Sequence, residues 1–147
     1  MENNEVEILL VEDSEADIEM TLRSLSESNV CNSVKVARDG REALEMLFAG
    51  KDGAEGIRPR VVLLDLKLPK VSGHEVLRRM KSDERTQGIP VVIMTSSGEQ
   101  ADIDRCYELG ANSYVVKPIV FEDFSRVVKE LKLYWLVVNE APSQKDQ

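Results

Sequence analysis

Three short apolar runs of the sequence end in charged residues: the first in the pair Glu12-Asp13, the second in Asp65 and the third in Lys117. The runs are rich in leucine and β-branched residues, a composition typical of buried parallel strands. A charged residue at the end of such a strand emerges at the carboxyl edge of the sheet, where open α/β sheets bind their ligands. We therefore expect the three carboxylates and the ammonium group to share one site.

The carboxylates of this predicted site would repel one another. At about 4 Å and an effective dielectric constant of about 20, each like-charged pair costs about 4 kcal/mol before solvent and ions respond. A cation must offset this repulsion, and the candidates are a divalent metal ion and the ammonium of Lys117. A hard site of oxygen ligands with room for water suits Mg²⁺.

Asp65 is the natural nucleophile among these residues. A carboxylate at a strand end beside a metal site can accept a phosphoryl group and form an acyl phosphate. Phosphoryl transfer requires mainly in-line positioning and neutralisation of charge on the transferring oxygens. Glu12 and Asp13 would hold Mg²⁺ together with Asp65. Lys117 would pair with the phosphate from the opposite side.

Thr95 ends another apolar run, and its hydroxyl can donate a hydrogen bond to a phosphate oxygen. If that bond draws Thr95 inward, the ring of Tyr114 on the neighbouring strand could move into the vacated space. A phosphate adds between about one and two negative charges, enough to bias a two-state loop through charge-assisted hydrogen bonds. Two plainer interpretations stay open: Thr95 as an ordinary strand residue, because threonine favours strands, and Tyr114 as a packing residue.

Strand-like runs alternate with helical patterns, which predicts an α/β protein with a five-stranded parallel sheet covered on both faces. The predicted strands lie at about 6–11, 33–37, 60–65, 90–95 and 112–116. The predicted helices begin at about Ser14, after Asp39-Gly40, at Ser72 or Gly73 and near Gly98, and Gly110 ends the fourth of them. The residues of the fourth helix that we expect to face the core are Ile103, Cys106 and Tyr107.

A further helical pattern runs from Phe121 to Val138, but residues 133–138 are apolar on every side. A helix end that is hydrophobic all round needs a second partner surface, although this run could also pack against its own domain. The polar residues that follow are expected to be disordered. We therefore expect a folded domain over residues 1–138 and a tail over residues 139–147.

The composition bounds the class of protein. The 147 residues suffice for one domain with a full core, and we expect no separate output domain. A net charge of −8 argues against a general nucleic-acid or anionic-membrane binder. The sequence has no signal peptide and no run of about 18 apolar residues, so we expect a cytoplasmic protein. Cys31 and Cys106 lack metal-ligand spacing and are expected to be free thiols, and His74, the only histidine, is expected on the surface.

Five segments of the chain form an ordered series. They are Ile8-Leu9-Leu10-Val11-Glu12-Asp13, Leu63-Leu64-Asp65 with Leu68-Pro69 and Gly73, Met94-Thr95-Ser96, Gly110-Ala111 and Val116-Lys117-Pro118. In this order and spacing they resemble the receiver domain of two-component response regulators, over about residues 5–133. The resemblance implies a flavodoxin-like (βα)5 three-layer sandwich with strand order 2-1-3-4-5. It also implies that Asp65 receives a phosphoryl group from the phosphohistidine of a histidine kinase.

The same resemblance implies roles for individual residues. The Mg²⁺ ligands would be Glu12, Asp13, Asp65 and the backbone carbonyl of Lys67, the phosphate contacts Thr95 and Lys117, and the switch aromatic Tyr114. The Lys117-Pro118 bond would be a cis peptide. Lys67 and Ser97 would tune how fast water removes the phosphate. The protein would promote its own phosphorylation and dephosphorylation and would not be an enzyme for outside substrates.

The chain also resembles a narrower group, the stand-alone receivers that partner phytochrome-type and related histidine kinases. Two features carry this resemblance: the long loop before the third predicted strand, and the extension Tyr134-Trp135-Leu136 of the last helix. In such proteins the extended last helix often supports a homodimer, which would cover the surplus apolar surface. The implied partners are a phytochrome-like sensor kinase and a second copy of the chain.

The sequence disfavours other functions of a similar site. A haloacid-dehalogenase-like aspartyl-phosphate phosphatase needs a general acid two residues after its nucleophile, and Lys67 stands at that position. A flavin-binding electron carrier needs a phosphate-binding loop after the first strand, where Glu12 and Asp13 would repel phosphate. The sequence has no G-x-G-x-x-G motif, which disfavours dinucleotide binding.

Overall fold

The computed structural model describes residues 7–27, 33–48, 56–117 and 126 of the chain. Within these residues, strands and helices alternate as the sequence patterns predict. The strands are β1 (Ile8–Val11), β2 (Val34–Ala37), β3 (Val61–Leu64), β4 (Val91–Thr95) and β5 (Ser113–Val116). The helices are α1 (Glu15–Glu27), α2 (Gly40–Phe48), α3 (Gly73–Lys81) and α4 (Gln100–Leu109). The predictions for Pro118, Tyr134, Trp135 and Leu136 lie outside the described residues.

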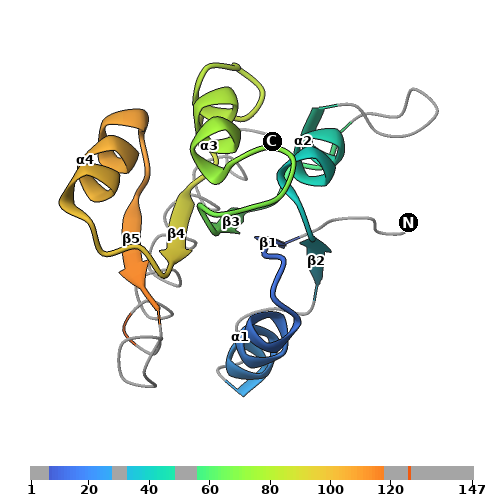
Figure 1. Ribbon diagram of the computed structural model, residues 1–147. Helices are drawn as coiled ribbons and strands as arrows, with labels where there is room; N and C mark the ends of the chain where they lie inside the picture. The colour runs from blue at the N-terminus through green and yellow to red at the C-terminus, as the bar shows by residue number, and fades with distance from the viewer. Residues whose placement is uncertain (1–6, 28–32, 49–55, 118–125, 127–147) are drawn as a thin grey trace.

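The five strands form one parallel sheet in the order β2-β1-β3-β4-β5, which confirms the predicted flavodoxin-like order. Leu10 of β1 is in register with Val36 of β2 and Leu63 of β3. Figure 1 shows α1 on one face of the sheet and α2, α3 and α4 on the other. The strand order reverses between β1 and β3, so the loops after these strands diverge at the carboxyl edge, where such sheets bind ligands.

Side chains of the strands alternate between two hydrophobic clusters, one on each face of the sheet. Leu9 and Val62 belong to the cluster shared with α2 and α3. Leu10 and Leu63 belong to the cluster shared with α1. All residues of β1, β3 and β4 are buried, because helices cover both faces. This two-sided burial explains why the central strands appear in the sequence as uninterrupted apolar runs.

Capping residues set the helix boundaries. Ser72 caps α3, and its hydroxyl accepts a hydrogen bond from the N–H of Glu75 at 3.2 Å. Gly110 ends α4 in the left-handed conformation, at a φ of 110°, which a residue without a side chain adopts readily. The helices are short as a result, and none within the described part of the chain is long and apolar enough to cross a membrane.

One predicted core position of α4 is wrong. Cys106 is fully buried, but Tyr107 is 49% exposed. Successive residues of a helix point about 100° apart, and α4 covers the sheet beside β5 with a narrow face. The residue after Cys106 therefore points away from the core.

The start of α3 lies directly against the end of β3. The N–H of Gly73 donates to the carbonyl of Leu66 at 2.8 Å. A Cβ atom at Gly73 would lie 2.1 Å from the carbonyl oxygen of Asp65, far inside van der Waals contact. Only glycine permits this approach, which fixes the backbone of Asp65 against the first turn of α3.

His74 lies between α3 and α4, so its predicted surface position is wrong. Its side chain is 16% exposed, and its Nε2 lies 3.6 Å from Oδ1 of Asp102. That separation is too long for a hydrogen bond, and Nε2 has no hydrogen-bond partner among the residues that the structure describes. Burial, and then the charge of Arg105, lower the pKa of His74, while Asp102 opposes the shift. The prediction failed because α4 packs against the first turn of α3, a tertiary contact that no local pattern encodes.

Replacing Gly73 with Ala should lower the free energy of unfolding by about 1–3 kcal/mol or more, because the added methyl group forces the backbone to move. Gly88→Ala is the matched control, since no atom lies within 4 Å of the position of its Cβ. We expect the control to change the free energy of unfolding by no more than about 0.5 kcal/mol. Urea unfolding followed by circular dichroism measures both, and equal losses would contradict the close approach at Gly73.

The single histidine allows a direct measurement by NMR. We expect the pKa of His74 to lie below its ordinary value of 6.5, and to fall further in Asp102→Asn, which removes the opposing carboxylate. Because folding lowers this pKa, the stabilisation by the neutral imidazole is fully present above pH 6.5 and is lost as the pH falls through the folded pKa. Urea unfolding should therefore depend less on pH across this window in His74→Gln. A pKa above 6.5, or a rise in Asp102→Asn, would show that burial does not govern this group.

Candidate functional site

Three carboxylates meet at the carboxyl edge of the sheet. Glu12 and Asp13 follow β1, Asp65 follows β3, and each offers an oxygen within 4.8 Å of the others. The register explains this meeting, because Val11 of β1 pairs with Leu64 of β3. Glu12 and Asp65 are 3% and 7% exposed, whereas Asp13 is open to solvent. The structure thus brings the predicted carboxylates together at the predicted edge.

Lys117, directly after β5, places its ammonium among these carboxylates. Its Nζ lies 2.6 Å from Oε1 of Glu12, 2.8 Å from Oδ2 of Asp17 and 3.1 Å from Oδ2 of Asp65. An ammonium group has three N–H donors, and these contacts use all of them. Burial alone would lower the pKa of Lys117, but the three hydrogen bonds override burial and raise the pKa above its ordinary value.

The site holds more negative than positive charge. The ammonium of Lys117 lies with four carboxylates, those of Glu12, Asp13, Asp17 and Asp65. Counted as formal charges, the four carboxylates and the one ammonium leave a surplus of three negative charges. Burial raises the pKa of Glu12, and the hydrogen bond from Lys117 only partly opposes that shift. Hard oxygen ligands with a surplus of negative charge fit a divalent cation such as Mg²⁺.

Asp17 is a site residue that the sequence analysis missed. It lies in the first turn of α1, where an acidic residue commonly favours the helix dipole. One signal could have identified it. Asp17 follows Glu12 and Asp13 by only a few residues, so the first turn of α1 holds its carboxylate near the same strand end. Its hydrogen bond with Lys117 joins α1 to the site.

Thr95 and Tyr114 lie on neighbouring strands and both contact the loop after β4. Thr95 is fully buried, and its Oγ1 accepts a long hydrogen bond from the N–H of Ser97, at 3.5 Å. The hydroxyl of Tyr114 donates to the carbonyl of Ser97 at 2.8 Å. The hydroxyl of Ser97 donates in turn to Asp102 of α4 at 2.5 Å. Any displacement of Thr95 would therefore act on Ser97, and through Ser97 on Tyr114 and α4.

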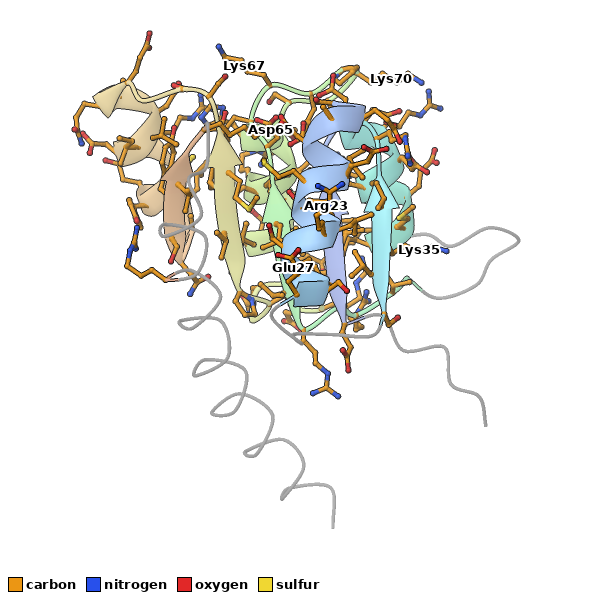
Figure 2. All side chains as sticks on the ribbon, turned by 90° about the horizontal axis from the view of Figure 1, so that it is seen from below. Arg23, Glu27, Lys35, Asp65, Lys67 and Lys70 are labelled. Carbon is orange, nitrogen blue, oxygen red and sulfur yellow. The ribbon has the colours of Figure 1, made fainter. Side chains whose placement is uncertain are left out.

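The loop from β3 to α3 carries two lysines, and Figure 2 shows them at the same edge of the molecule as Asp65. The N–H of Lys67 donates to Oδ1 of Asp65 at 3.3 Å, and the Lys67 side chain is exposed. Lys70 has a φ of 71°, and the N–H of Val71 donates to the carbonyl of Pro69 at 2.7 Å. These values describe a tight γ-turn, a strained form that clusters at functional sites. The role of the Lys67 carbonyl as a metal ligand stays a prediction.

Comparison with protein families and curated proteins gives consistent matches. Residues 8–129 match the family model of the response regulator receiver domain. The probable methanogenesis regulatory protein FilR2 of Methanothrix harundinacea is 44% identical over 135 residues, which cover 92% of this chain and 86% of that protein. The response regulator Rcp1 of Synechocystis is 35% identical over 136 residues, which cover 92% of each.

Solved structures of receivers share this fold. The bacteriophytochrome response regulator RtBRR is 47% identical, with a TM-score of 0.76 over 86% of this chain and 78% of its own. The Mn²⁺-bound form of Rcp1 is 36% identical, with a TM-score of 0.76 over 88% of this chain and 93% of its own. These matches do not support the haloacid-dehalogenase-like alternative. Because one family model spans most of the sequence and relatives of similar length align along it, the chain belongs to the response regulator receiver domain family.

Proposed function

We propose that this protein is a response regulator whose Asp65 accepts a phosphoryl group from a sensor histidine kinase. The observation that carries the proposal is that the carboxylate of Asp65 makes two kinds of contact. It belongs to the acidic cluster, and it also contacts the ammonium of Lys117. Glu12 shares both contacts, and each carboxylate also accepts one backbone N–H, that of Ser14 at 3.1 Å for Glu12 and that of Lys67 at 3.3 Å for Asp65. Glu12 is the more deeply buried of the two, at 3% exposed against 7% for Asp65. Asp65 is therefore the more accessible nucleophile, and membership of the receiver family supports the same reaction.

The proposed reaction depends on Mg²⁺, and the residues present fit this ion. The carboxylates of Glu12, Asp13 and Asp65 would hold it, and the backbone carbonyl of Lys67 would add a further oxygen ligand. When bound, Mg²⁺ supplies positive charge that offsets the charge on the transferring phosphoryl oxygens. The relative Rcp1 has a solved Mn²⁺-bound form, which supports the binding of a divalent cation by a protein of this fold.

The chain's own residues would carry out the transfer. A carboxylate oxygen of Asp65 forms a bond to phosphorus as the bond from phosphorus to the donor's imidazole nitrogen breaks, and the electron pair leaves with that nitrogen. Lys117 already contacts the reacting carboxylate at 3.1 Å and would donate to a phosphoryl oxygen. Thr95, at the end of β4, would donate its hydroxyl to another oxygen.

The proposed reaction modifies the protein itself and turns over no outside substrate. A phosphatase would carry its general acid at the position of Lys67, and the long lysine side chain is exposed there. Lys67 and Ser97 would instead affect how fast water removes the phosphate from Asp65.

Four further statements about the chain stay predictions. They are the domain bounds 1–138, the tail 139–147, the cis peptide at Pro118 and the cytoplasmic location.

The donor that we propose is a phytochrome-like sensor histidine kinase. RtBRR, 47% identical to this chain, is by name a bacteriophytochrome response regulator. FilR2, 44% identical, is by name a probable methanogenesis regulatory protein, so overall similarity does not separate the two kinds of input. Phosphotransfer profiling against a panel that includes phytochrome-like and other histidine kinases identifies the donor by its rate of transfer.

The signal would leave the site through Thr95. A phosphoryl group that draws the Thr95 hydroxyl toward itself would break the long contact with the N–H of Ser97. Ser97 also binds the hydroxyl of Tyr114 and the carboxylate of Asp102. The loop after β4, the ring of Tyr114 and the start of α4 would therefore rearrange together.

We also propose a homodimer formed through the C-terminal segment. Its support is the run Leu133 to Val138, which the sequence makes apolar on every side and which includes Tyr134, Trp135 and Leu136. Burial of such an apolar surface against a second copy of the chain removes it from water and is therefore favourable.

Incubation with Mg²⁺ and acetyl phosphate should label the wild-type protein, and Asp65→Asn should reduce the label to background, because the amide cannot form the acyl phosphate. Intact mass spectrometry measures the added group, and peptide mapping locates it. Asp104→Asn, at an exposed position of α4, is the matched control and should label like the wild type. Persistent labelling of Asp65→Asn would overturn the assignment.

Trp135→Ala should shift the protein from dimer to monomer in sedimentation velocity at micromolar concentration, because a large aromatic side chain often dominates an interface. Met20→Ala removes another large apolar side chain, 39% exposed on α1, and should leave the mass unchanged. An unchanged mass of Trp135→Ala, or a monomeric wild type, would refute this dimer.

A further inference from the structure

Asp17 is a contact of Lys117 that the proposed function leaves unexplained. Its Oδ2 accepts a hydrogen bond from Nζ of Lys117 at 2.8 Å, shorter than the 3.1 Å contact from the same Nζ to Asp65. The acidic cluster found among the described residues consists of Glu12, Asp13 and Asp65, and Asp17 lies outside it. Its side chain is 32% exposed. Asp17 thus belongs to the site through Lys117.

All the donors of Lys117 are used in this arrangement. The ammonium has three N–H groups, and Glu12, Asp17 and Asp65 each accept one. A phosphoryl oxygen on Asp65 can gain a donor from Lys117 only if one of these contacts lengthens or breaks. Binding of the phosphoryl group is therefore a competition with an acceptor that is already in place.

Asp17 differs from the other two acceptors in its charge environment. A cation held by the acidic cluster would offset the charges of Glu12 and Asp65 directly. Asp17 lies outside the cluster, so it would keep more of its attraction for Lys117. Its negative charge also opposes the approach of a further anion to Asp65. Asp17 is therefore the acceptor that competes most strongly with a phosphoryl group.

We infer that Asp17 is a positioning residue that holds the ammonium of Lys117 and competes with the phosphoryl group for it, which weakens the hold of the site on that group. The inference rests on the proposed function. The same carboxylate strengthens the attraction of the site for a divalent cation, because Coulomb interactions act beyond contact distance. The two effects have opposite signs, and this opposition makes the inference testable.

Asp17→Asn keeps the size and the acceptor oxygen of the side chain but removes its charge. We expect the dissociation constant for Mg²⁺ to rise about threefold to tenfold. At saturating Mg²⁺, the dissociation constant for beryllofluoride, a mimic of the phosphoryl group, should fall by about the same factor. Isothermal titration calorimetry on the full chain measures both. Asp17→Glu restores the charge on a longer side chain and should return both constants toward the wild-type values.

Glu19→Gln is the matched control, because it removes one negative charge from an exposed position of the same helix. Screening by solvent and salt should keep both of its dissociation constants within about twofold of the wild type. Urea unfolding checks that each variant is folded. A loss of structure would weaken the binding of both Mg²⁺ and beryllofluoride. Release of Lys117 would instead move the two dissociation constants in opposite directions.

Unchanged binding of beryllofluoride by Asp17→Asn would overturn the inference, and so would an equal change in Glu19→Gln. Weaker binding of both ligands would give Asp17 a purely structural role and would overturn it as well. Failure of the proposed function has a different signature: a wild type that neither binds beryllofluoride nor labels at Asp65. In that case the inference falls with the function on which it rests.

Discussion

The contact between the ammonium of Lys117 and carboxylates from three other segments is the interaction on which the rest of this structure depends. Glu12 comes from the end of β1, Asp17 from α1 and Asp65 from the end of β3, at 2.6, 2.8 and 3.1 Å from Nζ. Leaving a buried charge without its partner costs about 3–5 kcal/mol. The ammonium therefore permits the burial of Glu12 and Asp65, and it ties β5 to the central strands through their charged ends.

The strand order determines which side chain can make this contact. β5 lies two positions from β3 and three from β1 in the sheet, and neighbouring strands are about 4.8 Å apart. Lys117 meets the carboxylates because it stands just past the end of β5 and carries a long flexible stem, and because the side chains of Glu12 and Asp65 reach toward it. Its backbone N–H is held by the carbonyl of Thr95 at 2.7 Å. The attachment point is therefore fixed while the ammonium can exchange partners, just as the close approach of Gly73 fixes the backbone of Asp65.

Local sequence patterns predicted the strands, the helix boundaries and the meeting of the carboxylates with Lys117, because buried strands and capping residues leave signals in their own segments. Asp17 was missed because an acidic residue in the first turn of a helix has an ordinary role near the helix dipole, so its type does not mark it as a site residue. Tyr107 and His74 were placed wrongly for a different reason. The burial of both side chains depends on how α4 packs against α3 and the edge of the sheet. This tertiary packing outweighs the helical periodicity of the sequence.

Electrostatics also limits how such a site can respond. The site has a formal surplus of three negative charges, and conversion of a carboxylate to a phosphoryl group carrying about −1.5 to −2 adds roughly one more at most. Because the net charge changes little, the response depends on which hydrogen-bond partners the new charge attracts. The contact of Thr95 with Ser97 is long, at 3.5 Å, and hydrogen bonds of that length are weak. Because Thr95 Oγ1 only accepts in that contact, Thr95 would donate its hydroxyl to a phosphoryl oxygen at little cost, whereas Lys117 would have to release one of its shorter contacts. The weak contact of Thr95 would let this residue respond readily to the phosphoryl group. The stronger contacts of Lys117 would determine how much free energy the phosphoryl group must supply to displace one of them.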